Sequence, residues 1–141
     1  APAPAANYVP AVRSGDLLFI AGQLPIIDGK PQYLGKVGAD VKVEDGQKAA
    51  RICAINLLAQ VKTALNGDLD RLKRCVRVGG FVNATQDFTD HPAVINGASD
   101  FLVQALGDAG KHLGKMQNSR VLRGVRTGSG SRGKPARRSG R

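Results

Sequence analysis

Residues 72–105 read LKRCVRVGGFVNATQDFTDHPAVINGASDFLVQA, and within this stretch the hydrophobic period changes from two residues to nearly four. From Leu72 to Asn83 the side chains alternate, as they do along a β-strand whose two faces meet different surroundings. One face carries Val76, Val78, Gly80 and Val82, and the other carries Cys75, Arg77, Gly79, Phe81 and Asn83. Further on, the capping residues Thr89 and Asp90 precede Pro92 and a helical stripe formed by Val94, Ala98, Phe101, Leu102 and Ala105. The stretch predicts a strand followed by a helix.

Upstream, residues 43–65 show the period of a second helix. Small or apolar residues recur on one stripe at Ala50, Cys53, Ala54, Leu57, Val61, Ala64 and Leu65. Glu44 and Asp45 fall in the first turn, where the helix dipole favours acidic side chains. Asn66-Gly67 is a pair that typically ends a helix in the left-handed conformation. We therefore expect a helix from Val43 to about Leu65.

The N-terminal part of the chain predicts a hairpin. Its two runs, Tyr8–Val12 and Leu17–Ala21, are separated by the turn signal of residues 13–16, and the second run is apolar enough for a buried strand. Asp28 then starts a loop that continues to about Asp40. The order strand, strand, helix, strand, helix predicts an α+β fold in which a small sheet carries two helices on one face.

Composition limits the class of protein. The 141 residues fit one domain, and no apolar run reaches the roughly 18 residues that a membrane span needs. Cys53 and Cys75 have no C-x-x-C spacing and no neighbouring histidine, so we expect small buried apolar side chains and no metal site or redox pair. This cysteine usage fits a reducing cytoplasm, and we expect a cytoplasmic protein without membrane contact.

Charge divides the chain unevenly. Residues 1–110 hold 11 basic and 11 acidic residues, whereas residues 111–141 hold ten basic residues and no acidic one, which accounts for the net charge of +10. From Gly128 to Arg141 only Gly, Ser, Arg, Lys, Pro and Ala occur, a composition that cannot bury a core. We expect residues 1–112 to form the domain and residues 113–141 to be a basic segment that is partly disordered.

Three stretches resemble the RidA/YjgF family of enamine and imine deaminases, also called L-PSP endoribonuclease-like. They are NYVPAV (7–12), LFIAGQLP (18–25) and GFVN (80–83) running on to Asp87-Phe88. The runs GKVGAD (35–40) and PAVINGASD (92–100) are similar to one bacterial branch of that family. The resemblance covers about residues 5–112. It implies a chorismate-mutase-like α+β fold that forms a homotrimer, with ligand clefts between neighbouring subunits.

The resemblance also implies a chemistry. The best-known members of the family hydrolyse reactive enamines and imines, such as 2-aminoacrylate, to 2-keto acids and ammonia. An arginine grips the carboxylate of the small metabolite, and positioned water attacks the imine carbon. No metal or organic cofactor is required.

Four residues match the family's cleft. Tyr8 matches the cleft tyrosine, Gly22 and Gln23 match the end of an S-G-Q motif, and Phe88 matches the cleft aromatic, whereas Ala21 stands where that motif usually has serine. Each has a plain alternative. Tyr8 also suits a half-buried hairpin residue, the Gly-Gln pair a strand end, and Phe88 the core.

The C-terminal segment departs from the family, in which a run like A-R-S-A-V-G supplies the gripping arginine and a strand like V-E-V-E-A supplies an acid. Here no clear period follows His112, no Asp or Glu occurs beyond Asp108, and the family's final strand is absent as sequence. Arg120 is our candidate for the gripping arginine, if a short loop is inserted before it. The abrupt change to Arg, Gly and Ser also fits a change of reading frame in a GC-rich gene.

Two other functions stay open. A non-catalytic trimer would bind a small ligand or another protein through the same clefts, and the missing acid favours this alternative. An RNA-binding or endoribonuclease-like protein would use the basic tail for weak nucleic-acid contact, since Arg/Gly/Ser segments can follow a phosphate backbone. The tail has no aromatic residue with which to stack bases.

Overall fold

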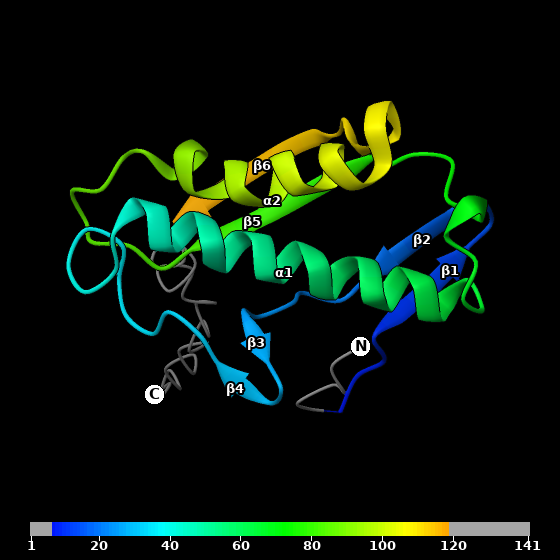
Figure 1. Ribbon diagram of the computed structural model, residues 1–141, viewed down its shortest axis with the longest axis horizontal. Helices are drawn as coiled ribbons and strands as arrows, with labels where there is room; N and C mark the ends of the chain where they lie inside the picture. The colour runs from blue at the N-terminus through cyan, green and yellow to red at the C-terminus, as the bar shows by residue number, and fades with distance from the viewer. Residues whose placement is uncertain (1–6, 119–141) are drawn as a thin grey trace, which may run out of the picture.

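In the computed structural model, which describes residues 7–118 and only the backbone of residues 115–118, two long helices lie side by side in one layer (Figure 1). Helix α1 spans Val43–Ala64 and helix α2 spans His91–Leu106, as the sequence predicts. Within this part of the chain no helix combines the length and the apolar character that crossing a membrane requires.

The helices begin and end at residues that carry the corresponding signals. At the start of α2, Asp90 accepts a hydrogen bond from the backbone N–H of Ala93 at 3.3 Å. Gly107 follows the helix with a φ of 61°, and after α1 Asn66 and Gly67 have φ values of 56° and 89°. A residue with a positive φ cannot continue the right-handed α-helical turn, so these conformations end both helices. Gly107, with a ψ of −137°, lies in a region that is open almost only to glycine.

Small residues let the two helices approach closely. At Gly97 of α2, a methyl group would collide with the backbone carbonyl of Gln47 in α1. The side-chain amide of Gln47 in turn donates to the carbonyl of Ala93 at 2.9 Å. The helix layer is therefore held by direct contact between backbones as well as by apolar side chains.

The N-terminal hairpin forms as predicted. Strands β1 (Ala11–Ser14) and β2 (Leu17–Ile20) pair antiparallel, with Val12 opposite Phe19. Gly15 in the tight turn has a φ of 57°, a conformation in which glycine is favoured.

A second hairpin occupies part of the segment that we expected to be a loop. Strands β3 (Ile26–Ile27) and β4 (Lys30–Pro31) pair antiparallel across Asp28-Gly29. These two turn residues have φ values of 49° and 75°, as a two-residue hairpin turn of the mirror-image type requires. Asp-Gly is a known signal for this turn, so the hairpin could have been predicted from the sequence.

Strands β5 (Arg77–Val82) and β6 (Leu113–Asn118) pair in parallel, with α2 as the connection between them. A parallel pair needs such a crossover, usually a helix. Strand β6 begins directly after the boundary that we predicted at residue 112, in a segment that shows no strand period. The short 3₁₀ helices Leu69–Arg71 and Gly107–Gly110 precede β5 and β6.

The expectation of one sheet needs correction. Among residues 7–118 the strands form three separate two-stranded ladders, β1-β2, β3-β4 and β5-β6. The physical reason is that β2 and β5 each hydrogen-bond to only one neighbour in this part of the chain. The α+β class and the placement of both helices on one face of the strands are confirmed (Figure 1).

The core lies between the helices and the strands in two clusters. The first consists of Val37, Val41, Val82, Ala84 and Val94, and the second of Ala50, Ala54, Ala98 and Leu102. Leu102 is only 3% exposed. Most of these residues are small, which matches the close approach of the elements that carry them.

The outer face of the strands, opposite the helices, is apolar and exposed. It carries the exposed side chains of Val12, Leu17, Phe19, Phe81 and Leu113. Phe19 is 58% exposed and Phe81 is 61% exposed. Our expectation of a fully buried strand at Leu17–Ala21 is therefore wrong for the single chain, in which only alternate residues of β2 face α1.

Candidate functional site

The open end of the first hairpin brings together three of the residues that we expected in a cleft. The backbone N–H of Ala21 donates to the carbonyl of Pro10 at 2.9 Å, which places the segment after β2 beside the segment before β1. Tyr8 lies just before this link and Gly22-Gln23 just after it. Tyr8 is 48% exposed, so its ring has room for a ligand or a partner.

Backbone donors are exposed at the same place. The N–H groups of Gly22, Gln23 and Leu24 donate to no acceptor within residues 7–118. The Gln23 side chain folds back and donates to the carbonyl of Ala21 at 3.0 Å and, more weakly, to that of Gly22 at 3.4 Å. Backbone N–H groups that have no partner within the protein are free to donate to a ligand's carboxylate or phosphate oxygens.

Helix α1 supports this segment through one side chain. The Asn56 amide nitrogen donates to the carbonyl of Leu24 and to the carbonyl of Ile26, both at 3.1 Å. The segment is thus attached to a rigid element immediately after its free donors.

The remaining two candidates are not part of this arrangement. Phe88 packs against the first core cluster and makes an edge-to-face contact with His91 at a centroid distance of 5.2 Å. Its partners belong to the core, and Tyr8 and Gln23 are not among them. Arg120 lies outside the residues that the structure describes, two positions after the end of β6. One chain therefore does not assemble the full predicted set within residues 7–118.

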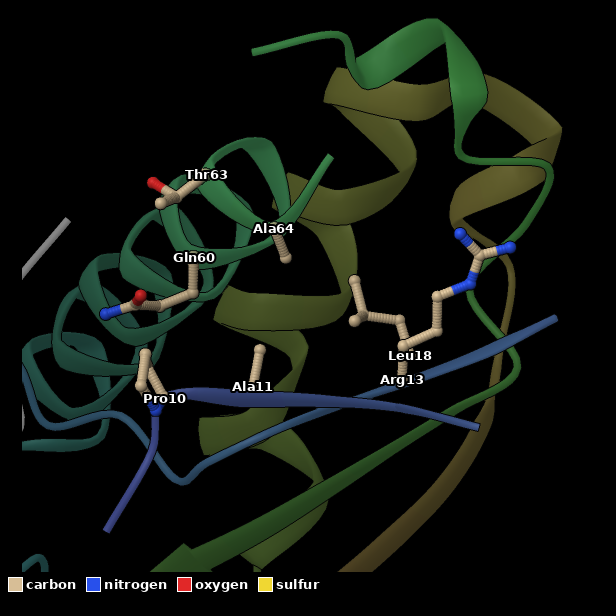
Figure 2. A pocket seen from close by; sticks show the side chains of 7 residues that line it. All are labelled: Pro10, Ala11, Arg13, Leu18, Gln60, Thr63 and Ala64. Atoms are coloured by element: carbon tan, nitrogen blue, oxygen red, sulfur yellow. The ribbon is translucent and has the colours of Figure 1, made fainter. Parts of the chain in front are cut away.

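A shallow hollow of about 340 Å³ lies between the first hairpin and the end of α1 (Figure 2). Its lining comes from Pro10, Ala11, Arg13, Leu18, Gln60, Thr63 and Ala64. Its polar groups are already engaged: Arg13 donates to the carbonyl of Gly15, and the Thr63 hydroxyl donates to the carbonyl of Ala59. None of the four cleft residues in the described part of the chain lines this hollow.

The titratable groups give little support to a second site. Both cysteines are partly buried, and burial raises the pKa of the Cys53 thiol to about 11. Burial also raises the pKa of Cys75, so neither thiol is an activated nucleophile. Across residues 7–118, no three His, Cys, Asp or Glu side chains converge as metal ligands would.

Comparison with known proteins places this geometry in a family. A family model described as YjgF/chorismate mutase-like, "putative endoribonuclease", matches residues 1–124. The chain belongs to the YjgF family. The match runs past residue 112 and includes β6, so the similarity of this YjgF chain to its family extends further than the sequence motifs indicated.

Relatives of this YjgF chain include Protein TCP17 of Trypanosoma cruzi, which is 46% identical over 113 residues, or 79% of this chain and 70% of that protein. The crystal structure of Atu1372 from Agrobacterium tumefaciens, a protein of unknown function, is 47% identical with a TM-score of 0.79 and covers 81% of this chain and 72% of its own. A "putative endoribonuclease" from Shewanella oneidensis is 38% identical with a TM-score of 0.79 over 82% and 76% of the two chains.

Sequence reasoning missed two polar residues of this YjgF chain. Asn56 and Gln60 both lie on α1 on the side that faces the strands, and Gln60 is only 4% exposed. The available signal was a polar residue among the apolar positions of a helix, which often means a hydrogen bond to another element. The sequence cannot show which carbonyl accepts that bond.

Proposed function

We propose that this YjgF-family chain is a hydrolase that deaminates reactive enamine and imine intermediates of small amino acids to 2-keto acids. The observation that carries the proposal is the set of N–H donors at Gly22, Gln23 and Leu24, which have no acceptor within residues 7–118 and follow the link between Ala21 and Pro10. These donors suit the carboxylate that such intermediates carry, because charge-assisted hydrogen bonds to a carboxylate are strong.

The reaction needs a held substrate and a positioned water molecule, and no covalent intermediate with the protein. Water adds to the imine carbon and gives one proton to the nitrogen, which forms a carbinolamine. The hydroxyl proton then passes to the nitrogen as the carbon–nitrogen bond breaks, so that ammonia leaves and the 2-keto acid remains. In the proposal the backbone donors and the Arg120 guanidinium hold the carboxylate, while Tyr8 and Phe88 line the cleft. Most of the rate acceleration comes from holding the water molecule next to the imine carbon in the orientation that the attack requires.

The proposal includes an assembly of three copies with clefts between neighbours. Two observations support assembly. The outer face of the strands exposes Phe19 and Phe81, and large apolar side chains left exposed on strands are typical of a protein–protein contact. In addition, Phe88 packs against the first core cluster, to which none of the hairpin residues of the described chain belongs, and in the proposal a second chain completes the set.

The deaminase activity is tested by generating 2-aminoacrylate enzymatically and measuring keto-acid release. We expect the full chain to accelerate release, Arg120→Ala to abolish the acceleration, and Arg123→Ala, a matched change in the same basic segment, to leave it intact. No acceleration at high protein concentration would refute the hydrolase.

A second candidate is a trimer of the same architecture that binds a small carboxylate without turning it over. Residues 109–141 contain no Asp or Glu, so the acid that positions water in the family has no counterpart there. Titration with 2-ketobutyrate separates the candidates: saturable binding without acceleration of imine hydrolysis favours this one.

RNA binding is the third candidate, favoured by the ten basic residues after position 110 and by the description of the Shewanella oneidensis relative. Truncation after Asn118 keeps β6 and removes eight of these ten residues. If the tail binds RNA, the truncated chain loses salt-sensitive retention on immobilised single-stranded RNA. Equal retention by both chains would exclude the tail as the RNA contact.

A further inference from the structure

We infer that Asn56 of α1 is a positioning residue that aims the backbone donors of Gly22, Gln23 and Leu24 at a ligand carboxylate. This inference rests on the proposed function, because it assigns a support to the same site. Asn56 itself does not touch the ligand in this account. It acts through the backbone that it holds.

The orientation of the Asn56 amide follows from its partners. Both groups within hydrogen-bond distance are carbonyl oxygens, those of Leu24 and Ile26, each at 3.1 Å. An amide nitrogen has two hydrogens and an amide oxygen has none, so only the nitrogen can satisfy both acceptors. Both hydrogens of the amide nitrogen are therefore engaged, one with each carbonyl.

These two carbonyls flank Pro25, which makes the attachment rigid. Proline fixes its own φ and has no N–H, so the local conformation has little freedom. The N–H of Ile26 donates to the carbonyl of Leu24 at 2.9 Å, and the N–H of Gln32 donates to the carbonyl of Pro25 at 2.8 Å. Residues 24–26 are thus attached both to α1 and to the residue that follows β4.

The free donors lie directly before this rigid point. The Gln23 side-chain amide donates to the carbonyls of Ala21 and Gly22, so these two carbonyls are already paired. The adjacent N–H groups then remain as the hydrogen-bonding groups that the segment can offer. Their direction depends on residues 24–26, which Asn56 fixes. A donor set that is a fraction of an ångström out of place loses much of its value for binding.

The test compares two isosteric changes on the same helix. Asn56→Asp replaces two donated hydrogen bonds by a carboxylate that faces two carbonyl oxygens. Gln47→Glu is the matched control, because Gln47 also donates from α1 to a backbone carbonyl, that of Ala93, but at the contact with α2. Both variants are made in the full chain, and thermal unfolding is recorded for each.

For Asn56→Asp we expect the affinity for 2-ketobutyrate to fall at least about tenfold, and the amide resonances of Gly22, Gln23 and Leu24 to shift. For Gln47→Glu we expect affinity within about twofold of the unchanged chain, although the unfolding temperature falls in both variants. A purely structural role for Asn56 would move only the unfolding temperature.

Three results overturn the inference: unchanged affinity in Asn56→Asp, an equal loss in Gln47→Glu, or unmoved resonances of Gly22, Gln23 and Leu24. If the unchanged chain binds no 2-ketobutyrate, the proposed function fails. The amide resonances then still decide whether Asn56 orients the segment, so the two failures are distinguishable.

Discussion

The two faces of β5 differ sharply, and two neighbouring glycines show the difference. Gly80 faces α2, where a side chain would collide with Ile95. Gly79 faces away from the helices, and a methyl group there would meet nothing within 4 Å. On the covered face a larger residue at position 80 would force Ile95 to shift, whereas at position 79 on the outer face there is open space.

The first hairpin repeats the contrast. Ala11 and Leu18 face the end of α1, while their neighbours Val12 and Phe19 are exposed on the other side. The covered face packs against α1, whereas the outer face exposes large apolar side chains in the part of the chain that the structure describes. This difference makes the outer face the surface on which a contact between copies of the chain is expected.

Breaking the covered face has the largest expected effect. Leu102→Ala removes a side chain that is almost fully buried in the second core cluster. We expect the free energy of unfolding to fall by about 2–5 kcal/mol, from lost burial and the cavity that remains. Chemical denaturation measures it, and a loss below about 1 kcal/mol would contradict the tight packing described for this cluster.

The reactivity of the Cys53 thiol measures how well the packing around helix α1 buries it. Because burial raises the pKa of Cys53 from 9.0 to about 11, its thiolate fraction at pH 8 is about 100-fold lower than that of a free thiol. We expect Cys53 to react with iodoacetamide more slowly by that factor, and faster as the pH rises toward 11. A Cys75→Ser chain isolates the reaction, and unfolded protein supplies the reference rate.

The close approach of the helices gives the next effect. Gly97→Ala places a methyl group against the carbonyl of Gln47, and we expect a loss of about 1–3 kcal/mol in the free energy of unfolding. Gly79→Ala is the matched control on the outer face and should cost less than about 0.5 kcal/mol. Equal losses would mean that the contrast between the faces does not govern stability.

The smallest effect on folding is expected at the outer face. Phe19→Ser should preserve the far-ultraviolet circular dichroism while lowering the mass of the particle in solution, since within residues 7–118 the Phe19 side chain is 58% exposed. Leu34→Ser is the control, because Leu34 is also exposed but lies in a loop outside the strands. Light scattering decides: an unchanged mass for Phe19→Ser would exclude this face as the contact between copies.

Local signals predicted most elements of the fold. Both helices, the first hairpin and the alternation of Arg77–Val82 follow from periodicity, capping residues and a turn signal. The alternation fails before Arg77, where Val76 is exposed and Cys75 packs against the core. There the N–H of Cys75 donates to the carbonyl of Ala109, and this contact between distant segments overrides the strand pattern.

Strand β6 shows the limit of local reasoning. Its sequence, LGKMQN, has no alternation, yet it pairs with β5 along its whole length. A parallel pair is stabilised by backbone hydrogen bonds that any sequence can make, once α2 returns the chain to that place. The candidate site shows the same limit, because motif matching singles out Tyr8, Gly22 and Gln23 as candidates but gives no indication of Asn56.

The sequence by itself determined the α+β class, the two helices and the family, because each depends on residues that are near one another in the chain. Only the tertiary structure decided that the strands form separate ladders, that their outer face is exposed, and that α1 holds the donor segment after β2. These features depend on hydrogen bonds and packing between segments distant in sequence, which no local pattern specifies.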